Sequence, residues 1–229
     1  MKYKYCLIDV DNTLLDFCYA EKHAHQVTCE TFNIPWNDEL YSVYHKINDD
    51  FWKALERKEY TKDEIIVFRH RDYFKYCGVE FDARTFNDEY VKNLSLGKKL
   101  MPYANELVKQ LYDSGLKLYI ATNGIAKVQY SRLSDQEFMK YISGLLISEE
   151  LGAQKPSCEF FKNASIKAGV DFSKDTIIIG DSLTSDVKGG INFGIDTLWV
   201  NVKNEENPFG DKITYIVNKL EEIPSLLLK

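Results

Sequence analysis

From about residue 99 onward, short apolar runs alternate with segments of helical periodicity, and this alternation constrains the fold more than any other feature. The apolar runs at 116–122, 144–148, 176–180 and 197–200, and a weaker one at 213–217, predict strands. The segments at 103–114, 125–139, 157–168, 184–193 and 219–227 predict helices, several of which end at a glycine. Short connections between alternating strands and helices favour a parallel sheet covered on both faces. We therefore expect an α/β fold with a doubly wound parallel sheet.

The N-terminal part of the chain departs from this pattern after one strand. Residues 5–8 form an apolar run that predicts the first strand. Residues 15–96 lack clear strand runs, and the amphipathic segments 39–57 and 62–76 predict helices. We expect an α/β core domain of residues 1–14 and 97–229, with a helical cap domain of residues 15–96 inserted after the first strand. The junctions near 15 and 96–100 could let the cap hinge over a site as a lid.

Composition excludes several classes of protein. The net charge of −6 and the pI near 5.3 argue against binding of a nucleic-acid polymer, which requires a basic face. No apolar stretch approaches the length that spans a membrane. The five cysteines are dispersed without a C-x-x-C pair, and the first strand follows the N-terminus too closely for a signal peptide. We expect a cytoplasmic protein with reduced cysteines, present as a monomer or homodimer.

Two aspartates, Asp9 and Asp11, follow directly after the first predicted strand. They therefore stand at the carboxyl edge of the sheet, where open α/β folds bind ligands. In a continuing strand the two side chains would point the same way, and paired carboxylates require a cation or a shared proton. The pattern suggests a divalent metal or a division of acid and base roles. On its own it also fits a solvated turn whose Asp and Asn side chains bond the backbone.

Three further motifs follow later strands. Thr122, Asn123 and Gly124 could form a small anion cradle at a helix start, or simply cap that helix. Lys155, before Pro156, could direct its ammonium group towards the aspartates, or could be a surface residue at a helix start.

The last motif places Asp181 at the end of the most apolar strand and Asp186 in the first turn of the next helix. Asp186 could merely complement the helix dipole. If the strands are neighbours, however, Asp181 joins Asp9 and Asp11. Carboxylate oxygens in that number suit Mg²⁺. Each motif has an ordinary local explanation. Together, however, the four motifs, each at the end of a predicted strand, predict a functional site.

These four motifs resemble those of the haloacid dehalogenase superfamily of aspartate-nucleophile phosphohydrolases. The resemblance covers essentially the whole chain and implies a Rossmann-like core with a cap of the family's first class. It implies that Asp9 is the nucleophile that forms an aspartyl-phosphate, and that Asp11 is the general acid and then the general base. Thr122, Asn123 and Lys155 would bind the phosphoryl group. Metal binding is implied for Asp9, Asp11 through its carbonyl, Asp181 and, in a supporting role, Asp186. Thr13 would brace the nucleophile loop.

An aspartate at position 11 points to phosphatase or phosphomutase chemistry within that superfamily. Residues 121–124, 128–129, 132–133 and 147–156 further resemble the pyrimidine 5′-nucleotidase-type branch. We therefore expect an Mg²⁺-dependent phosphomonoester hydrolase that acts on a small phosphorylated metabolite. The substrate that we expect first is a nucleoside 5′-monophosphate. The alternatives are a phosphatase for small sugar or glycolate-type phosphates, a sugar phosphomutase, or a catalytically idle binding or regulatory module.

The predicted cap also carries side chains suited to a base or sugar pocket. An aromatic residue such as Trp52 could stack on a nucleobase, although packing of the cap helices is the favoured explanation for Phe51 and Trp52. The candidates are Phe17, Phe51, Trp52, Arg69, His70 and Arg71.

Overall fold

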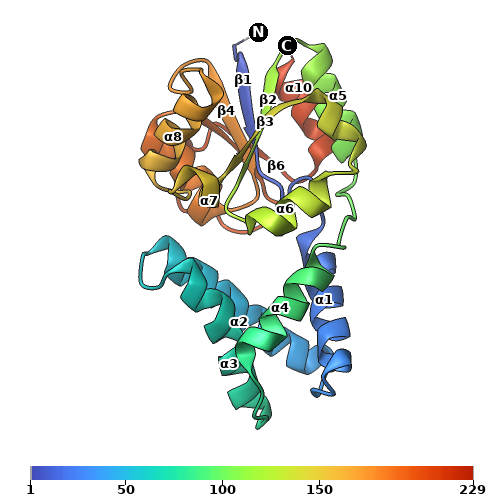
Figure 1. The fold of residues 1–229 in the computed structure, drawn as a ribbon. Helices are drawn as coiled ribbons and strands as arrows, with labels where there is room; N and C mark the ends of the chain where they lie inside the picture. Colours follow the sequence, from blue (N-terminus) through green and yellow to red (C-terminus); the bar gives the residue numbers. More distant parts are fainter. Residues whose placement is uncertain (1, 229) are drawn as a thin grey trace. The chain divides into compact units, whose positions relative to one another are not determined.

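The computed structural model describes residues 2–228, which Figure 1 shows as a ribbon. The chain divides into two compact units, Met1–Asp16 with Lys99–Lys229, and Phe17–Lys98. We call the first the α/β unit and the second the helical unit.

The α/β unit contains, among the described residues, a six-stranded parallel sheet in the order β3-β2-β1-β4-β5-β6. Strand β1 lies at its centre, and Ile8 stands opposite Ile120 of β2 and Ile179 of β4. The chain runs from β1 outward to β3 and then returns to β4, so the carboxyl ends of β1 and β4 form a topological switch point. The expected doubly wound α/β fold is confirmed. The strands are β1 Tyr5–Ile8, β2 Lys117–Thr122, β3 Ile142–Ile147, β4 Thr176–Gly180, β5 Asp196–Val200 and β6 Tyr215–Val217.

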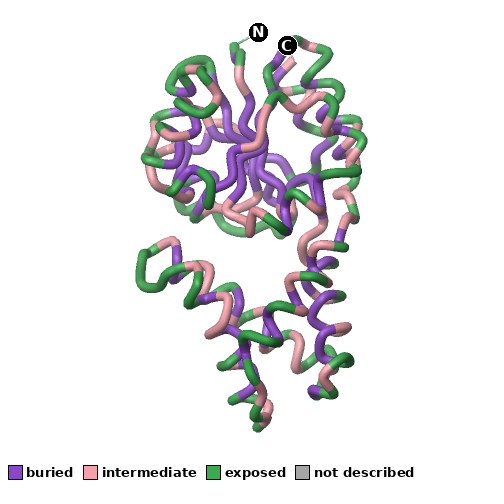
Figure 2. The backbone as a smooth tube through the Cα atoms, viewed as in Figure 1, coloured by how far each residue is buried: buried purple, intermediate pink, exposed green. Residues whose placement is uncertain are grey.

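Helices cover both faces of this sheet. Cys6 and Ile8 of β1 point into a core that includes residues of α5 (Ala104–Asp113) and α10 (Ile223–Leu227). Leu7, between them, points into a second core that includes residues of α8 (Cys158–Ala168). Figure 1 shows α5 and α10 on one side of the sheet and α8 on the other, and Figure 2 shows the buried strands between them. The unit also contains α6 Ala126–Leu133, α7 Ser148–Leu151 and α9 Lys188–Phe193, with 3₁₀ turns at Glu137–Tyr141, Gly210–Lys212 and Leu220–Glu222.

Three predicted helices differ from the observed ones. The helix expected at 125–139 ends at Leu133, because Ser134 and Asp135 favour a turn over a helix, and a 3₁₀ turn follows. The helix expected at 184–193 begins as a π-helical turn, Leu183–Val187, before α9 continues it. The helix expected at 219–227 begins at Ile223, where Pro224 occupies its first turn.

The helical unit consists of α1 Phe17–Thr31, α2 Asp38–Glu56, α3 Lys62–Cys77 and α4 Ala83–Leu94. Helix α1 packs against α4, and α2 packs against α3. The predicted helices 39–57 and 62–76 correspond to α2 and α3. Across residues 2–228, no helix combines the length and the apolar character that crossing a membrane requires.

The interior of the helical unit contains polar as well as aromatic side chains. Buried Glu21 accepts hydrogen bonds from Asn48 at 2.6 Å and from His45 at 2.5 Å. Arg69 is 1% exposed and donates to Asn48 and Asn87. His70 is fully buried. Arg69 and His70 therefore pack inside this unit, which makes them poor candidates for a pocket that binds a nucleobase.

Candidate active site

Asp9 and Lys155 form a buried ion pair at the carboxyl end of β1. Asp9 follows the last residue of the strand, and its backbone N–H donates to Ile179 of β4. The Lys155 ammonium donates to Asp9 Oδ1, to Asp186 Oδ1 and to the carbonyl of Ala121, each at 2.6 Å. These three acceptors match the three hydrogens of the ammonium group. Lys155, which is 1% exposed, is therefore part of the site and not a surface residue.

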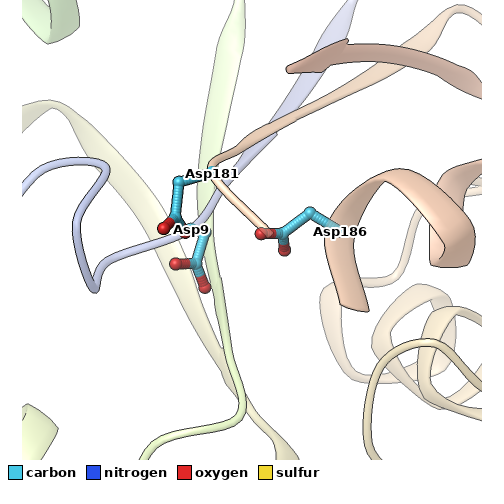
Figure 3. A group of neighbouring side chains, drawn as sticks. All are labelled: Asp9, Asp181 and Asp186. Carbon is cyan, nitrogen blue, oxygen red and sulfur yellow. The ribbon is translucent and has the colours of Figure 1, made fainter. Parts of the chain in front are cut away.

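Asp181 and Asp186 bring two more carboxylates to the same place, as Figure 3 shows. Asp181 follows β4, the neighbour of β1, and Asp186 lies in the π-helical turn. In that turn the N–H groups of Asp186 and Val187 both donate to the carbonyl of Ser182. The wider turn lets Asp186 Oδ2 accept from the Ser182 N–H at 3.2 Å, while Oδ1 faces Lys155. One oxygen of each of Asp9, Asp181 and Asp186 lies within 4.8 Å of the others.

The charges in this cluster do not balance, because it contains three carboxylates and one lysine, which contacts two of them. Burial raises the pKa of Asp9 to about 7, and Asp186 and Asp11 add to the shift while Lys155 opposes it. Burial also raises the pKa of Asp181 well above its usual range, with Asp9 and Asp186 as the next causes. Burial alone would lower the pKa of Lys155, but Asp186 and Asp9 outweigh it and raise that pKa.

Asp11 faces different partners from Asp9. Strand β1 ends at Ile8, and the carbonyl of Val10 accepts the N–H groups of Thr13, Leu14 and Leu15 in a tight turn. The chain therefore does not continue as a strand from Asp9 to Asp11, so the condition under which the two carboxylates would point the same way is not met. Asp11 Oδ1 accepts from Arg132 Nη1, and Asp11 Oδ2 accepts from Gln129 Nε2 at 2.7 Å.

Residues at the carboxyl end of β2 complete the site. The Thr122 hydroxyl is buried and accepts from the Gly124 N–H and from Gln129 Nε2, both at 3.0 Å. The Asn123 side chain donates to the Lys155 carbonyl and accepts from the Lys155 N–H, both at 2.9 Å. Asn123 thus holds the backbone of Lys155, and the phosphate contact predicted for Asn123 stays a prediction.

Two outcomes were not foreseen from the sequence. Thr13 is buried in the turn after Asp9, but its N–H makes the hydrogen bond to Val10, while its hydroxyl has no partner among the described residues. Gln129 and Arg132 contact Asp11, whereas the sequence pattern marked them only as features of a family branch. Their spacing of three residues, which places both on one face of a helix, was the available signal.

The cluster of Asp9, Asp181 and Asp186 fits a hard divalent cation. Its donors are carboxylate oxygens, the ligand type that Mg²⁺ prefers. Burial, and after it the neighbouring carboxylates, disfavour the charged forms of Asp9 and Asp181, and a bound cation would offset that effect. The carboxylate of Asp11 is outside this group, so the metal contact predicted for its backbone carbonyl stays a prediction.

The sequence profile of the haloacid dehalogenase-like hydrolases matches residues 6–200, which include all the site residues described above. The chain belongs to that family. The resemblance inferred from the four motifs is therefore confirmed.

Three relatives match this chain over 99% or more of its length. The HAD-hydrolase YfnB of Bacillus subtilis is 36% identical over 99% of this chain and 96% of its own. The pyrimidine 5′-nucleotidases PynA of Streptococcus pneumoniae and YjjG of Escherichia coli are 34% and 28% identical, each over 100% of this chain and over 97% and 100% of their own. A crystal structure of YfnB, described as bound to magnesium and as revealing interdomain movement, covers 99% of each chain with a TM-score of 0.92.

Proposed function

We propose that this hydrolase is an Mg²⁺-dependent phosphatase that cleaves nucleoside 5′-monophosphates through an aspartyl-phosphate on Asp9. The observation that carries the proposal is the buried Asp9 carboxylate, held by Lys155 at 2.6 Å beside Asp181 and Asp186. A nucleophilic carboxylate, a fixed cation and a metal-binding cluster are the parts that phosphoryl transfer through a covalent intermediate requires.

In the first step, a carboxylate oxygen of Asp9 bonds to phosphorus as the ester P–O bond breaks. Asp11 gives its proton to the leaving oxygen, which departs as an alcohol. The Thr122 hydroxyl accepts two hydrogen bonds, so its own hydrogen is available for a phosphoryl oxygen. Lys155 already makes three bonds, so it would exchange one of them for a phosphoryl oxygen.

In the second step, a water oxygen bonds to phosphorus as the bond between phosphorus and Asp9 breaks. Asp11, now a carboxylate, takes a proton from that water, and inorganic phosphate and the starting carboxylate of Asp9 result. Asp9, Asp181 and Asp186, with the carbonyl of Asp11, would hold Mg²⁺. When bound, the ion supplies positive charge that stabilises the phosphoryl group in transfer.

Two full-length relatives named pyrimidine 5′-nucleotidases support nucleoside monophosphates as the substrate class. The test is phosphate release with Mg²⁺ from uridine, thymidine and adenosine 5′-monophosphates, ribose 5-phosphate and phosphoglycolate. We expect the pyrimidine nucleotides to give the highest kcat/KM. A chelator should abolish release, and Asp9→Asn should lower it on the order of 10⁴-fold.

The matched control is Asp113→Asn, which makes the same change at an exposed position on α5 and should act like the wild type. Release confined to sugar or glycolate phosphates would keep the mechanism but overturn the substrate class. No Mg²⁺-dependent release from any substrate would overturn the phosphatase proposal in favour of a phosphomutase or a binding module.

A further inference from the structure

The carboxyl group of Asp11 is held at both oxygens by side chains of one helix. Arg132 Nη1 donates to Oδ1, and Gln129 Nε2 donates to Oδ2 at 2.7 Å. The Asp11 side chain is 26% exposed, whereas Arg132 is 0% and Gln129 is 1% exposed. The Asp11 carboxyl group, which is partly exposed to solvent, is thus held by two buried hydrogen-bond donors. Each carboxyl oxygen has two lone-pair positions, so each retains one for a transferring proton.

Gln129 also connects Asp11 to the hydroxyl of Thr122. Its amide nitrogen carries two hydrogens, and the second reaches Thr122 Oγ1 at 3.0 Å. Arg132 Nη1 donates to Gln129 Oε1 at 3.3 Å, which favours this orientation of the amide. With the Gly124 N–H as second donor, both acceptor positions of the Thr122 hydroxyl are filled. The hydroxyl can therefore act only as a donor towards a ligand.

The loop after β2 is shaped to admit Gln129. A Cβ atom at residue 124 would overlap the Gln129 side chain at its amide nitrogen, Cδ and Cγ. Glycine at position 124 thus leaves the space that Gln129 occupies. The Arg132 side chain is fully buried, and its ion pair with Asp11 compensates part of the cost of removing its charge from water.

We propose that Arg132 and Gln129 are positioning residues for the two proton transfers: Arg132 orients Asp11, and Gln129 locks Asp11 and the Thr122 hydroxyl in one arrangement. The inference rests on the proposed function and adds two residues that control its acid–base step. Misplacing Asp11 slows proton donation to an alkyl leaving group and proton removal from the attacking water. It does not slow the departure of an aryl oxide, which needs no proton.

The test compares Arg132→Met, Gln129→Met and the control Lys127→Met, which removes a positive charge from the exposed side of the same helix. Turnover of uridine 5′-monophosphate should fall about 10- to 100-fold in the first two variants and stay unchanged in the control. With p-nitrophenyl phosphate under rapid mixing, the first two variants should release a burst of one p-nitrophenol per enzyme before a slow steady phase. Gln129→Met should also weaken inhibition by inorganic phosphate, because Thr122 loses a fixed partner.

Circular dichroism and thermal unfolding show whether each variant is folded. If Arg132→Met does not fold, Arg132→Lys retains the charge and should give the same burst with a smaller loss of turnover. Folded variants that lose activity equally on both substrates, without a burst, would overturn the inference while the proposed function stands. A wild type without phosphatase activity would overturn the proposed function and this inference together.

Discussion

Two buried histidines should make the helical unit sensitive to acid. Burial lowers the pKa of His25 to about 3, with Arg69 as the second cause. Burial, Arg69 and His25 lower the pKa of His70 well below its usual value of 6.5. The unfolded chain takes up these protons below pH 6.5, whereas the folded unit takes up the one on His25 only near pH 3. Stability is therefore present above pH 6.5 and is lost as the pH falls below it.

The size of the effect follows from the same shift. As the pH falls from 7.5 to 5.5, each histidine that stays neutral in the folded unit lowers the free energy of unfolding by about 1.4 kcal/mol. The raised pKa of Asp9 acts in the opposite direction over this range, so the difference between two variants is the quantity to measure. His70→Phe keeps an aromatic ring beside Tyr44 and removes one titrating group.

The assay is urea unfolding followed by tryptophan fluorescence at the two pH values. We expect the stability of His70→Phe relative to the wild type to rise by about 1.4 kcal/mol from pH 7.5 to 5.5. His23→Gln, at an exposed position on the same helix as His25, should show no such change. A difference between His70→Phe and the wild type that does not vary with pH would refute the reasoning.

Three further predictions concern the acidic cluster. Gly180→Ala should lower the free energy of unfolding by about 1–3 kcal/mol in urea titrations and reduce turnover, because the new Cβ would overlap the Asp186 carboxylate; wild-type values would show that this contact is tolerated. Lys155→Met should abolish turnover in kinetic assays, because it leaves Asp9 and Asp186 without their shared cation, and it should not strengthen the binding of substrate or phosphate. Retained turnover would contradict the role of Lys155. Millimolar Mg²⁺ should raise the wild-type Tm and should raise that of Asp181→Asn less, and equal shifts in both proteins would place the ion elsewhere.

The sequence predicted the sheet and the place of the site because both follow from strong local signals. The strands of the α/β unit are mostly apolar runs, and β1 and β4 are each followed by an aspartate that parallel pairing brings to one edge of the sheet. The lengths of α6 and α10 were less predictable, since they depend on which turn competes locally with the helix. Ser134 and Pro224 decide those two helix boundaries.

The partners of Asp11 could not be derived from local pattern. A helix carrying Gln129 and Arg132 is compatible with many orientations, and only the packing of α6 beside the β1 turn brings them to Asp11. Asn123 shows the same limit. Its residue type suggested a cap or a phosphate contact, whereas its side chain pairs with the backbone of Lys155, 32 residues away. Contacts between distant segments are fixed by tertiary packing, which a single sequence does not reveal.

The central claim is that Asp9 becomes phosphorylated, and a quenched-flow experiment with mass spectrometry tests it most directly. Asp11→Asn should slow hydrolysis of the proposed intermediate, so with Mg²⁺ and p-nitrophenyl phosphate the enzyme should gain the mass of one phosphoryl group. Peptide mapping should place that group on the peptide containing Asp9, and the further change Asp9→Asn should remove it. Continued turnover with no phosphoryl group on that peptide, or a group that persists in Asp9→Asn, would contradict the account.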